Sequence, residues 1–532
     1  MGARTGAAGS RRRAGRGFVL GALALYAASA VLATWPAIRH VEGHYLARPA
    51  AGFGEAAAGD HLQLRWAFWL VGHQLERGGA PWEDPYSFRP EAEAPPNVQG
   101  WLLGVPYWPL DRLLGGVWAY NLLVLLSTVA AGGLACWWLR ALGLPRGAAL
   151  AGGLVFALAP YRVGQSTGHL LGLVSFLLPG LLLALERRRP AWAGAVLLAI
   201  PLSGQLHLAL GAVPLCAAYV WARLPRELWG RAALAAAPAV GAGLAVYLAV
   251  VRGSIAAGGR SLASVERYSA ELSDFVTRGV GAGVEELVFL GWLVPPLAAA
   301  GLVVAWRRQR GLAWLLGLAA LLPGLLALGT NLPLYEPLWR ALPPLRFARV
   351  PERLLPIGWL ALAALVALAL GLVFQRHKRR GTALAAAALA LLAIDLHVPV
   401  FGAVEAETGA AAYAALRGEG RLLELPVFRP DLHFGSSYLS YATRSPRERP
   451  QGYSTTAPPA ADRLARELRG LSCGRGELPA RLGIRYVALH RGLYRQSRFF
   501  GPACPARVKT WLRARGWREV ARSGAVSVYA AG

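Results

Sequence analysis

The sequence predicts an all-α polytopic membrane protein with a small α/β domain at its C-terminal end. Of its 532 residues, 55% are hydrophobic and only 16% are charged, and the apolar residues gather in runs long enough to cross a bilayer. Arginines cluster at the ends of these runs, as they do in the cytoplasmic turns of membrane proteins. From about residue 399 the long runs give way to segments of strand length. We therefore expect a membrane domain over 1–398 and a second domain over 399–532.

The apolar runs match the length of a membrane-spanning helix, about 17–25 residues, and they predict about eleven such helices. The runs lie near residues 17–38, 116–140, 146–162, 168–186, 190–205, 206–224, 231–251, 286–306, 311–329, 353–374 and 381–398. Arg11–Arg13 precede the first run, and every second turn is basic, which places the N-terminus in the cytoplasm. With an odd number of spans, residues 399–532 are extracytoplasmic, and we expect an inner (cytoplasmic) membrane protein.

The net charge of +27 comes from 56 Lys and Arg against 29 Asp and Glu. Such an excess can indicate a nucleic-acid-binding protein. Here the arginines sit at the ends of apolar runs, and no basic strip interleaved with aromatic residues follows a path for a nucleic-acid strand. Membrane lipids are therefore the expected partners, and no nucleic acid is expected.

The first external loop, about 39–115, contains a helix pattern from Asp60 to about Arg77. Leu62, Trp66, Trp69 and Leu70 share one face of this helix, and tryptophans with apolar neighbours favour the membrane–water boundary. We expect a helix lying flat on the bilayer that holds Asp60 at the mouth of a cavity. Asp60 followed by Gln63 is also a helix-capping pattern, so a cap and a functional carboxylate both remain open.

Further polar side chains gather on the same expected side of the membrane. One group is Arg162, Gln165 and His169, between two apolar runs. Gln165 and His169 are one helical turn apart and could face the same cavity, although hydrogen bonding between helices is an equal alternative. The other group is Arg349 and Arg353, just ahead of an apolar run. Arginines bind phosphate oxygens in a fork, and they also extend to lipid headgroups.

The C-terminal region predicts a small mixed domain. Strand patterns occur at 421–427, 485–490 and 525–529, and helix patterns at about 459–470 and 505–515 separate them. Cys473 and Cys504 lie in this region and could form a disulfide if it is extracytoplasmic. Cys136 and Cys216 lie within apolar runs, where an inert packing role is expected.

Several stretches resemble the GT-C superfamily of integral-membrane glycosyltransferases, in particular YfhO-like and related bacterial GT-C-type proteins. They are Gly59–Gln63, Ala159–Gln165 with His169, and Arg349–Arg353, together with Gln451–Tyr453 and Leu482–Val487 in the tail. The resemblance implies a GT-C-like membrane domain over 1–398 that transfers a sugar from a polyprenyl-phosphate-linked donor. The acceptor would be a glycan, lipid or protein at the extracytoplasmic face.

The resemblance also implies roles for individual residues. Asp60 corresponds to the first-loop acid of the family, the base that deprotonates the acceptor hydroxyl. Many members have two adjacent acids, whereas here His61 follows Asp60. Donor phosphate would lie on Arg349, Arg353 and Arg162, and His61, Gln165 and His169 would line the substrate cavity. No metal and no other cofactor is expected, because the first loop has no Asp-x-Asp pair.

Two other functions remain open on the sequence. One is a non-catalytic GT-C-like accessory protein, since the usual second acid is missing. The other is a transporter or flippase of lipid-linked glycans. Transporters place charged groups or broken helices near the bilayer midplane, whereas the centres of these apolar runs carry almost no polar residues. The pattern therefore favours chemistry at one membrane surface.

Overall fold

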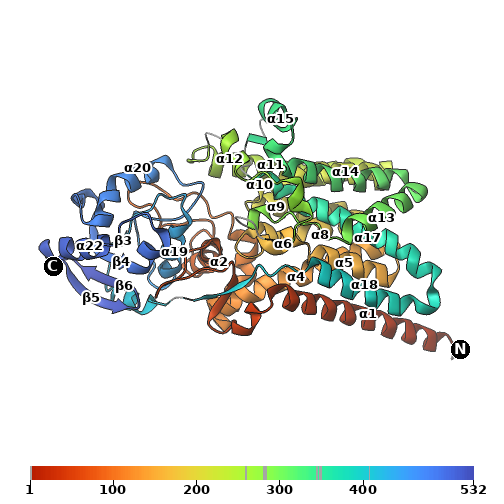
Figure 1. The fold of residues 1–532 in the computed structure, drawn as a ribbon, viewed down its shortest axis with the longest axis horizontal. Helices are drawn as coiled ribbons and strands as arrows, with labels where there is room; N and C mark the ends of the chain where they lie inside the picture. The colour runs from red at the N-terminus through yellow and green to blue at the C-terminus, as the bar shows by residue number, and fades with distance from the viewer. Residues whose placement is uncertain (1–2, 258–260, 280–283, 343–344, 347–349, 407) are drawn as a thin grey trace.

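A computed structural model describes residues 3–257, 261–279, 284–342, 345–346, 350–406 and 408–532. A bundle of long helices occupies one end of the molecule, and a small sheet with flanking helices occupies the other (Figure 1). The first loop and helix α2 (Asp60–Glu76) lie between these two parts. This order places Asp60 at the junction of the bundle and the C-terminal sheet.

The long helices of the bundle follow the predicted apolar runs. They are α1 (Ala3–Thr34), α4 (Gly116–Ala141), α5 (Arg146–Ala157), α8 (Leu177–Glu186), α9 (Pro190–Leu202), α10 (Leu206–Arg223), α11 (Trp229–Val246), α13 (Val294–Arg308), α14 (Arg310–Ala327), α17 (Leu355–Arg376) and α18 (Gly381–Leu396). By length and composition six helical segments of the described chain can cross a membrane, and four more are apolar but shorter. The chain is thus a multi-pass membrane protein, while the count of about eleven spans stays a prediction.

Helix α17 forms the centre of the bundle, packed against α5, α13 and α14. Most of its residues are buried. Glycines on the neighbouring helices permit this close packing: a Cβ at Gly301 of α13 would lie 1.8 Å from the Leu365 carbonyl oxygen. A Cβ at Gly152 of α5 would lie 2.8 Å from the Ala363 carbonyl oxygen. Small residues at such contacts are typical of helix packing within membranes.

The C-terminal sheet has the strand order β3-β4-β6-β5. Its strands are β3 (Arg421–Leu425), β4 (Ile484–His490), β5 (Arg518–Ser523) and β6 (Val526–Ala530). β3 and β4 pair in parallel, and the other neighbours pair antiparallel. Helices α20 (Pro459–Leu468) and α22 (Cys504–Ala514) pack on an apolar core that includes Leu423, Val487 and Leu512. The predicted strands and helices of this region are confirmed, and β5 is an addition.

Two strands that the sequence did not predict connect the halves of the chain. β1 (His44–Ala47) in the first loop pairs antiparallel with β2 (Gly402–Glu405), which follows α18. Asn121 of α4 holds this ribbon against the bundle: its side chain accepts from the Leu46 backbone N–H at 2.8 Å and donates to the His44 carbonyl at 2.8 Å. The start of the loop that carries Asp60 is therefore fixed to the helices.

The helix after Asp60 is largely buried within the protein and does not expose its apolar face as expected. Eleven of its 17 residues are buried, including the polar side chains of Arg65 and Gln74. The reason is that α19 (Ser436–Ala442) of the C-terminal part covers it on one side and α3 (Trp101–Leu114) on another. The exposed apolar face belongs to α3 instead, where Leu113 is 80% exposed. Such a face suits the membrane–water boundary.

Candidate active site

The Asp60 carboxylate joins three segments that are far apart in the sequence. Its Oδ2 lies 2.9 Å from Nε2 of His169, which precedes α7 (Leu170–Val174). Its Oδ1 accepts a hydrogen bond from the Tyr453 hydroxyl of the C-terminal part at 2.6 Å. Asp60 is the first residue of α2, Gly59 is the N-cap, and no side-chain capping bond is formed. The capping interpretation of Asp60 is therefore wrong, and its carboxylate is free of the helix backbone.

A second carboxylate, Glu285, extends this arrangement. Its Oε1 lies 3.8 Å from Nδ1 of His169 and accepts from Nη2 of Arg353 at 3.1 Å. Its Oε2 accepts from the Gln165 side chain at 2.8 Å. The charges thus alternate along a row formed by Asp60, His169, Glu285 and Arg353. We call these four residues, together with Gln165 and Tyr453, the Asp60 cluster. The structure brings together four of the residues predicted from sequence: Asp60, Gln165, His169 and Arg353.

Electrostatics keep both carboxyls of the cluster ionised. Burial acts to raise the pKa of Asp60, but hydrogen bonds from His169 and Tyr453 outweigh it and hold that pKa well below its usual range. Burial likewise acts to raise the pKa of Glu285, while Arg353 and His169 lower it to about 2. For His169, burial opposes the charge, but the two carboxylates raise its pKa above the usual value. The cluster therefore favours two carboxylates around a protonated imidazole.

The cluster remains accessible from outside the protein. The side chains of Asp60, His169 and Arg353 are 31%, 21% and 28% exposed. A cavity of about 70 Å³ lies one helical turn further along α2, and Gln63, Trp66 and Tyr453 are among its lining residues. Tyr453 thus contacts Asp60 and also borders the cavity. Within the described ranges, no three His, Cys, Asp or Glu side chains are placed to share a metal ion.

Two other predicted site residues, His61 and Arg162, do not join the cluster. The His61 ring is buried and packs on the Tyr45 ring with centroids 5.4 Å apart, and burial lowers its pKa to about 4. The Arg162 guanidinium is fully buried in the bundle, where it donates to the Ala157 carbonyl at 2.9 Å. A donor phosphate could not reach it without displacing helices. Arg349 lies outside the described residues.

A buried charge network fixes the loop just ahead of Asp60. Glu55 and His490 of β4 are both fully buried, and Oε2 of Glu55 lies 2.5 Å from Nδ1 of His490. Nε2 of His490 lies 3.0 Å from Glu424 of β3, which also accepts from Arg449 at 2.8 Å. Tyr413 donates to Glu424 at 2.7 Å. The network joins the first loop, which carries Asp60, to the C-terminal part, which carries Tyr453. It therefore fixes the positions of Asp60 and Tyr453 relative to each other.

Sequence reasoning missed Glu285 and Tyr453. Glu285 lies in the long connection between α11 and α13, which carries several acids without a periodic pattern. In the sequence, Tyr453 stands out only as part of the Gln451–Tyr453 stretch in the tail. Glu285 contacts Gln165, which is 120 positions away in the sequence, and Tyr453 contacts Asp60, which is 393 positions away. Neither carries a local signal that could have identified it.

The fold is similar to that of known membrane glycosyltransferases. The sequence matches no protein-family model and no curated relative. Among solved structures, arabinofuranosyltransferase AftD from Mycobacteria superposes with a TM-score of 0.60 and 16% identity over 97% of this chain. A mutant of AftD gives 0.57 and 18% identity over the same share. The chain spans 40% and 42% of those two chains.

ArnT from Cupriavidus metallidurans, in a structure bound to undecaprenyl phosphate, gives a TM-score of 0.45 and 15% identity over 97% of this chain and 98% of ArnT. AftD and ArnT both belong to the GT-C superfamily. The resemblance first drawn from short motifs is thus confirmed at the level of the fold, on the superposition with AftD. This chain therefore shares its fold with the arabinofuranosyltransferase AftD.

Proposed function

We propose that this protein transfers a sugar from a polyprenyl-phosphate-linked donor to an acceptor hydroxyl at the extracytoplasmic face of the inner membrane. The observation that carries the proposal is the position of the Asp60 carboxylate, ionised and partly exposed, between His169 and Tyr453. The N-terminus is then cytoplasmic, residues 1–398 form the membrane domain, and residues 399–532 form an extracytoplasmic domain. The acceptor is a glycan, a lipid or a protein.

Asp60 acts as the general base in this reaction. The acceptor oxygen forms a bond to the anomeric carbon, the bond from that carbon to the phosphate oxygen breaks, and the acceptor proton passes to the Asp60 carboxylate. The electron pair leaves with the polyprenyl phosphate. A carboxylate with a lowered pKa is a weak base in the resting site. An acceptor hydroxyl that displaces the Tyr453 or His169 hydrogen bond raises its basicity, and the hydroxyl itself becomes acidic as its bond to carbon forms.

Arg353 binds the donor phosphate. It stands at the start of α17 in the turn Pro351–Leu354, and its guanidinium is partly exposed beside Glu285. A phosphate already carries negative charge as a leaving group, so it needs a cation rather than a proton. In the resting site, Arg353 forms an ion pair with Glu285. When the donor phosphate binds Arg353, the imidazole of His169 remains as a positively charged partner for Glu285. Arg349 is the second cation proposed for the phosphate.

Transfer of radiolabelled sugar from a panel of polyprenyl-phosphate sugars tests the proposal. The assay compares the native protein with Asp60→Asn, which keeps the size of the side chain and removes the base. Glu42→Gln is the matched control, because Glu42 is an exposed acid of the same loop. We expect a loss of about 100-fold or more in Asp60→Asn, the range of a missing general base, and native activity in Glu42→Gln. Equal activity in all three proteins would refute the role of Asp60.

A further inference from the structure

The C-terminal part contains a large cavity that the proposed transfer reaction does not use. It measures about 870 Å³ and is lined by α21 (Arg491–Ser497), α22 and residues of β4, β5 and β6. These elements lie at the end of the molecule opposite the helical bundle (Figure 1). We call it the α21–α22 groove. Its volume falls in the range of about 300–1,000 Å³ typical of sites for small organic ligands.

The groove is positively charged. Arg495, Arg498 and Lys509 are among its lining residues, and the described lining includes no Asp or Glu. Lys509 lies 3.8 Å from Glu519, an acid that Arg522 also neutralises. Arg495 and Arg498 are exposed, and no ion pair to either is formed within the described part of the chain. Two guanidinium groups are thus available to bind anions.

One wall of the groove offers flat apolar surface. The Phe499 ring is 49% exposed although it is large and apolar. The next residue, Phe500, also lines the groove and packs edge-on against Tyr494 with ring centroids 5.6 Å apart. An exposed ring next to cationic side chains is suited to a ligand that has both apolar C–H faces and negative groups. A sugar ring with a carboxylate substituent has both.

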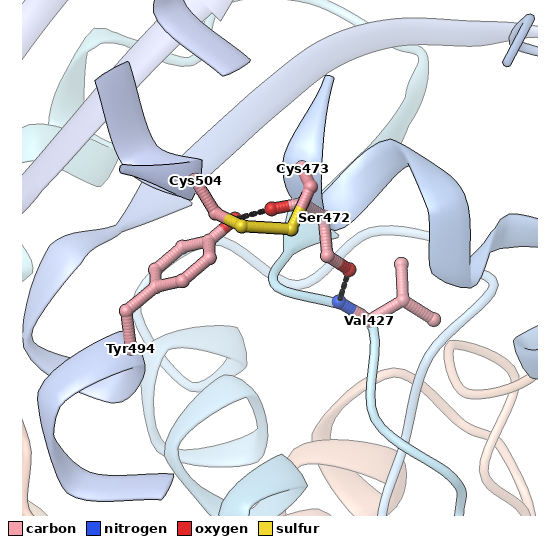
Figure 2. The surroundings of a disulfide bond; sticks show 5 residues. All are labelled: Val427, Ser472, Cys473, Tyr494 and Cys504. Atoms are coloured by element: carbon pink, nitrogen blue, oxygen red, sulfur yellow. Dashed lines mark hydrogen bonds between the residues drawn. A yellow bond between two sulfur atoms is a disulfide. The ribbon is translucent and has the colours of Figure 1, made fainter. Parts of the chain in front are cut away.

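The walls are held in place by the segment between α20 and β4. The disulfide Cys473–Cys504 ties the first residue of α22 to this segment. The Tyr494 hydroxyl of α21 donates to the carbonyl of Ser472, the residue before Cys473, at 2.7 Å. Figure 2 shows both connections side by side. Because the two helices are fixed to adjacent residues, the groove between them is preformed, which lowers the entropic cost of binding.

We propose that the α21–α22 groove binds an acidic oligosaccharide segment, with Arg495 and Arg498 on its carboxylates and Phe499 against a sugar face. A nucleic-acid strand is less well suited, because proteins bind single strands along extended grooves with several stacking rings. Here the described lining includes one exposed aromatic ring, that of Phe499. The proposal does not depend on the transfer reaction at Asp60.

Binding of hexagalacturonate to the full-length protein in detergent, measured by calorimetry, tests the proposal. Maltohexaose has the same number of rings without carboxylates, and we expect it to bind at least about tenfold more weakly, or about 1.4 kcal/mol. The variant R495E/R498E should weaken hexagalacturonate binding by at least the same factor. R463E/R469E is the matched control, since it makes the same charge change on exposed arginines of the same domain outside the groove. It should bind like the native protein.

Four results would overturn the proposal. They are no binding of hexagalacturonate, equal binding of maltohexaose, equal losses in R495E/R498E and R463E/R469E, and tighter groove-dependent binding of a six-residue oligothymidylate. Equal losses would mean that binding follows net charge alone. The last result would assign the groove to nucleic acid. Thermal unfolding of both variants should match that of the native protein, because all four arginines are exposed.

Discussion

Raising the pH to 10 should loosen the C-terminal sheet from the first loop, because His490 then loses its charge. His490, Glu55 and Glu424 are all fully buried. Burial acts to lower the pKa of His490, but the two carboxylates outweigh it and raise that pKa to about 9. The charged imidazole is therefore the form that holds the two carboxylates together.

The magnitude follows from the difference between the folded and unfolded states. A histidine in the unfolded chain has a pKa of about 6.5, and each unit of difference is worth about 1.4 kcal/mol. A rise to about 9 thus corresponds to about 3 kcal/mol. Since the folded pKa is the higher one, this stability is fully present below pH 6.5. It is lost progressively as the pH rises from 6.5 through about 9.

Unfolding of the native protein and of His490→Gln, followed between pH 6 and pH 10, measures this effect. Glutamine cannot become charged, so the variant should start less stable and lack this part of the pH dependence. His40→Gln removes an exposed histidine of the first loop and should keep the native pH dependence. Parallel curves for native protein and His490→Gln would refute the reasoning, because they would show that His490 is not charged in the fold.

Two further substitutions test the Asp60 cluster through kcat and through the KM for the sugar donor. Tyr453→Phe removes the hydroxyl that donates to Asp60 at 2.6 Å. A hydrogen bond to a charged group is worth about 1.5–3 kcal/mol, or about one to two pH units, and this one lowers the pKa of Asp60. We therefore expect the acid limb of the pH profile of kcat to move to higher pH by about one unit or more, with little change in the donor KM; an unmoved acid limb would contradict this role. Arg353→Ala should raise the donor KM by about tenfold or more, because a charge-assisted bond to phosphate is lost, and an unchanged KM would place the phosphate elsewhere.

Local sequence patterns account for much of the fold. Long apolar runs predicted the helices of the bundle, and short alternating segments predicted β3, β4 and β6, since hydropathy and its period are local properties. β5 was missed because its residues are mostly exposed and show no regular alternation of apolar side chains. β1 and β2 are four residues each and pair across more than 350 positions. Pairing at that distance leaves no local pattern in either segment.

The candidate site was predictable only in part, for the same reason. Asp60, Gln165, His169 and Arg353 stood out because each is a polar residue beside an apolar segment on one expected side of the membrane. Which of them meet depends on tertiary packing. The burial of α2 beneath α19 also came from tertiary packing, because its amphipathic pattern suits a protein surface as well as a membrane surface. The disulfide Cys473–Cys504, open on the sequence, is formed in the structure.

A structure of the protein with a non-transferable polyprenyl-phosphonate sugar is the most direct test of the proposed site. If Arg353 binds the donor phosphate, the phosphonate lies within hydrogen-bonding distance of its guanidinium. The anomeric carbon should then lie on the side facing Asp60, with room for an acceptor oxygen about 3–3.5 Å away. A sugar bound at another place in the bundle, or with Asp60 behind the phosphonate, would contradict the account.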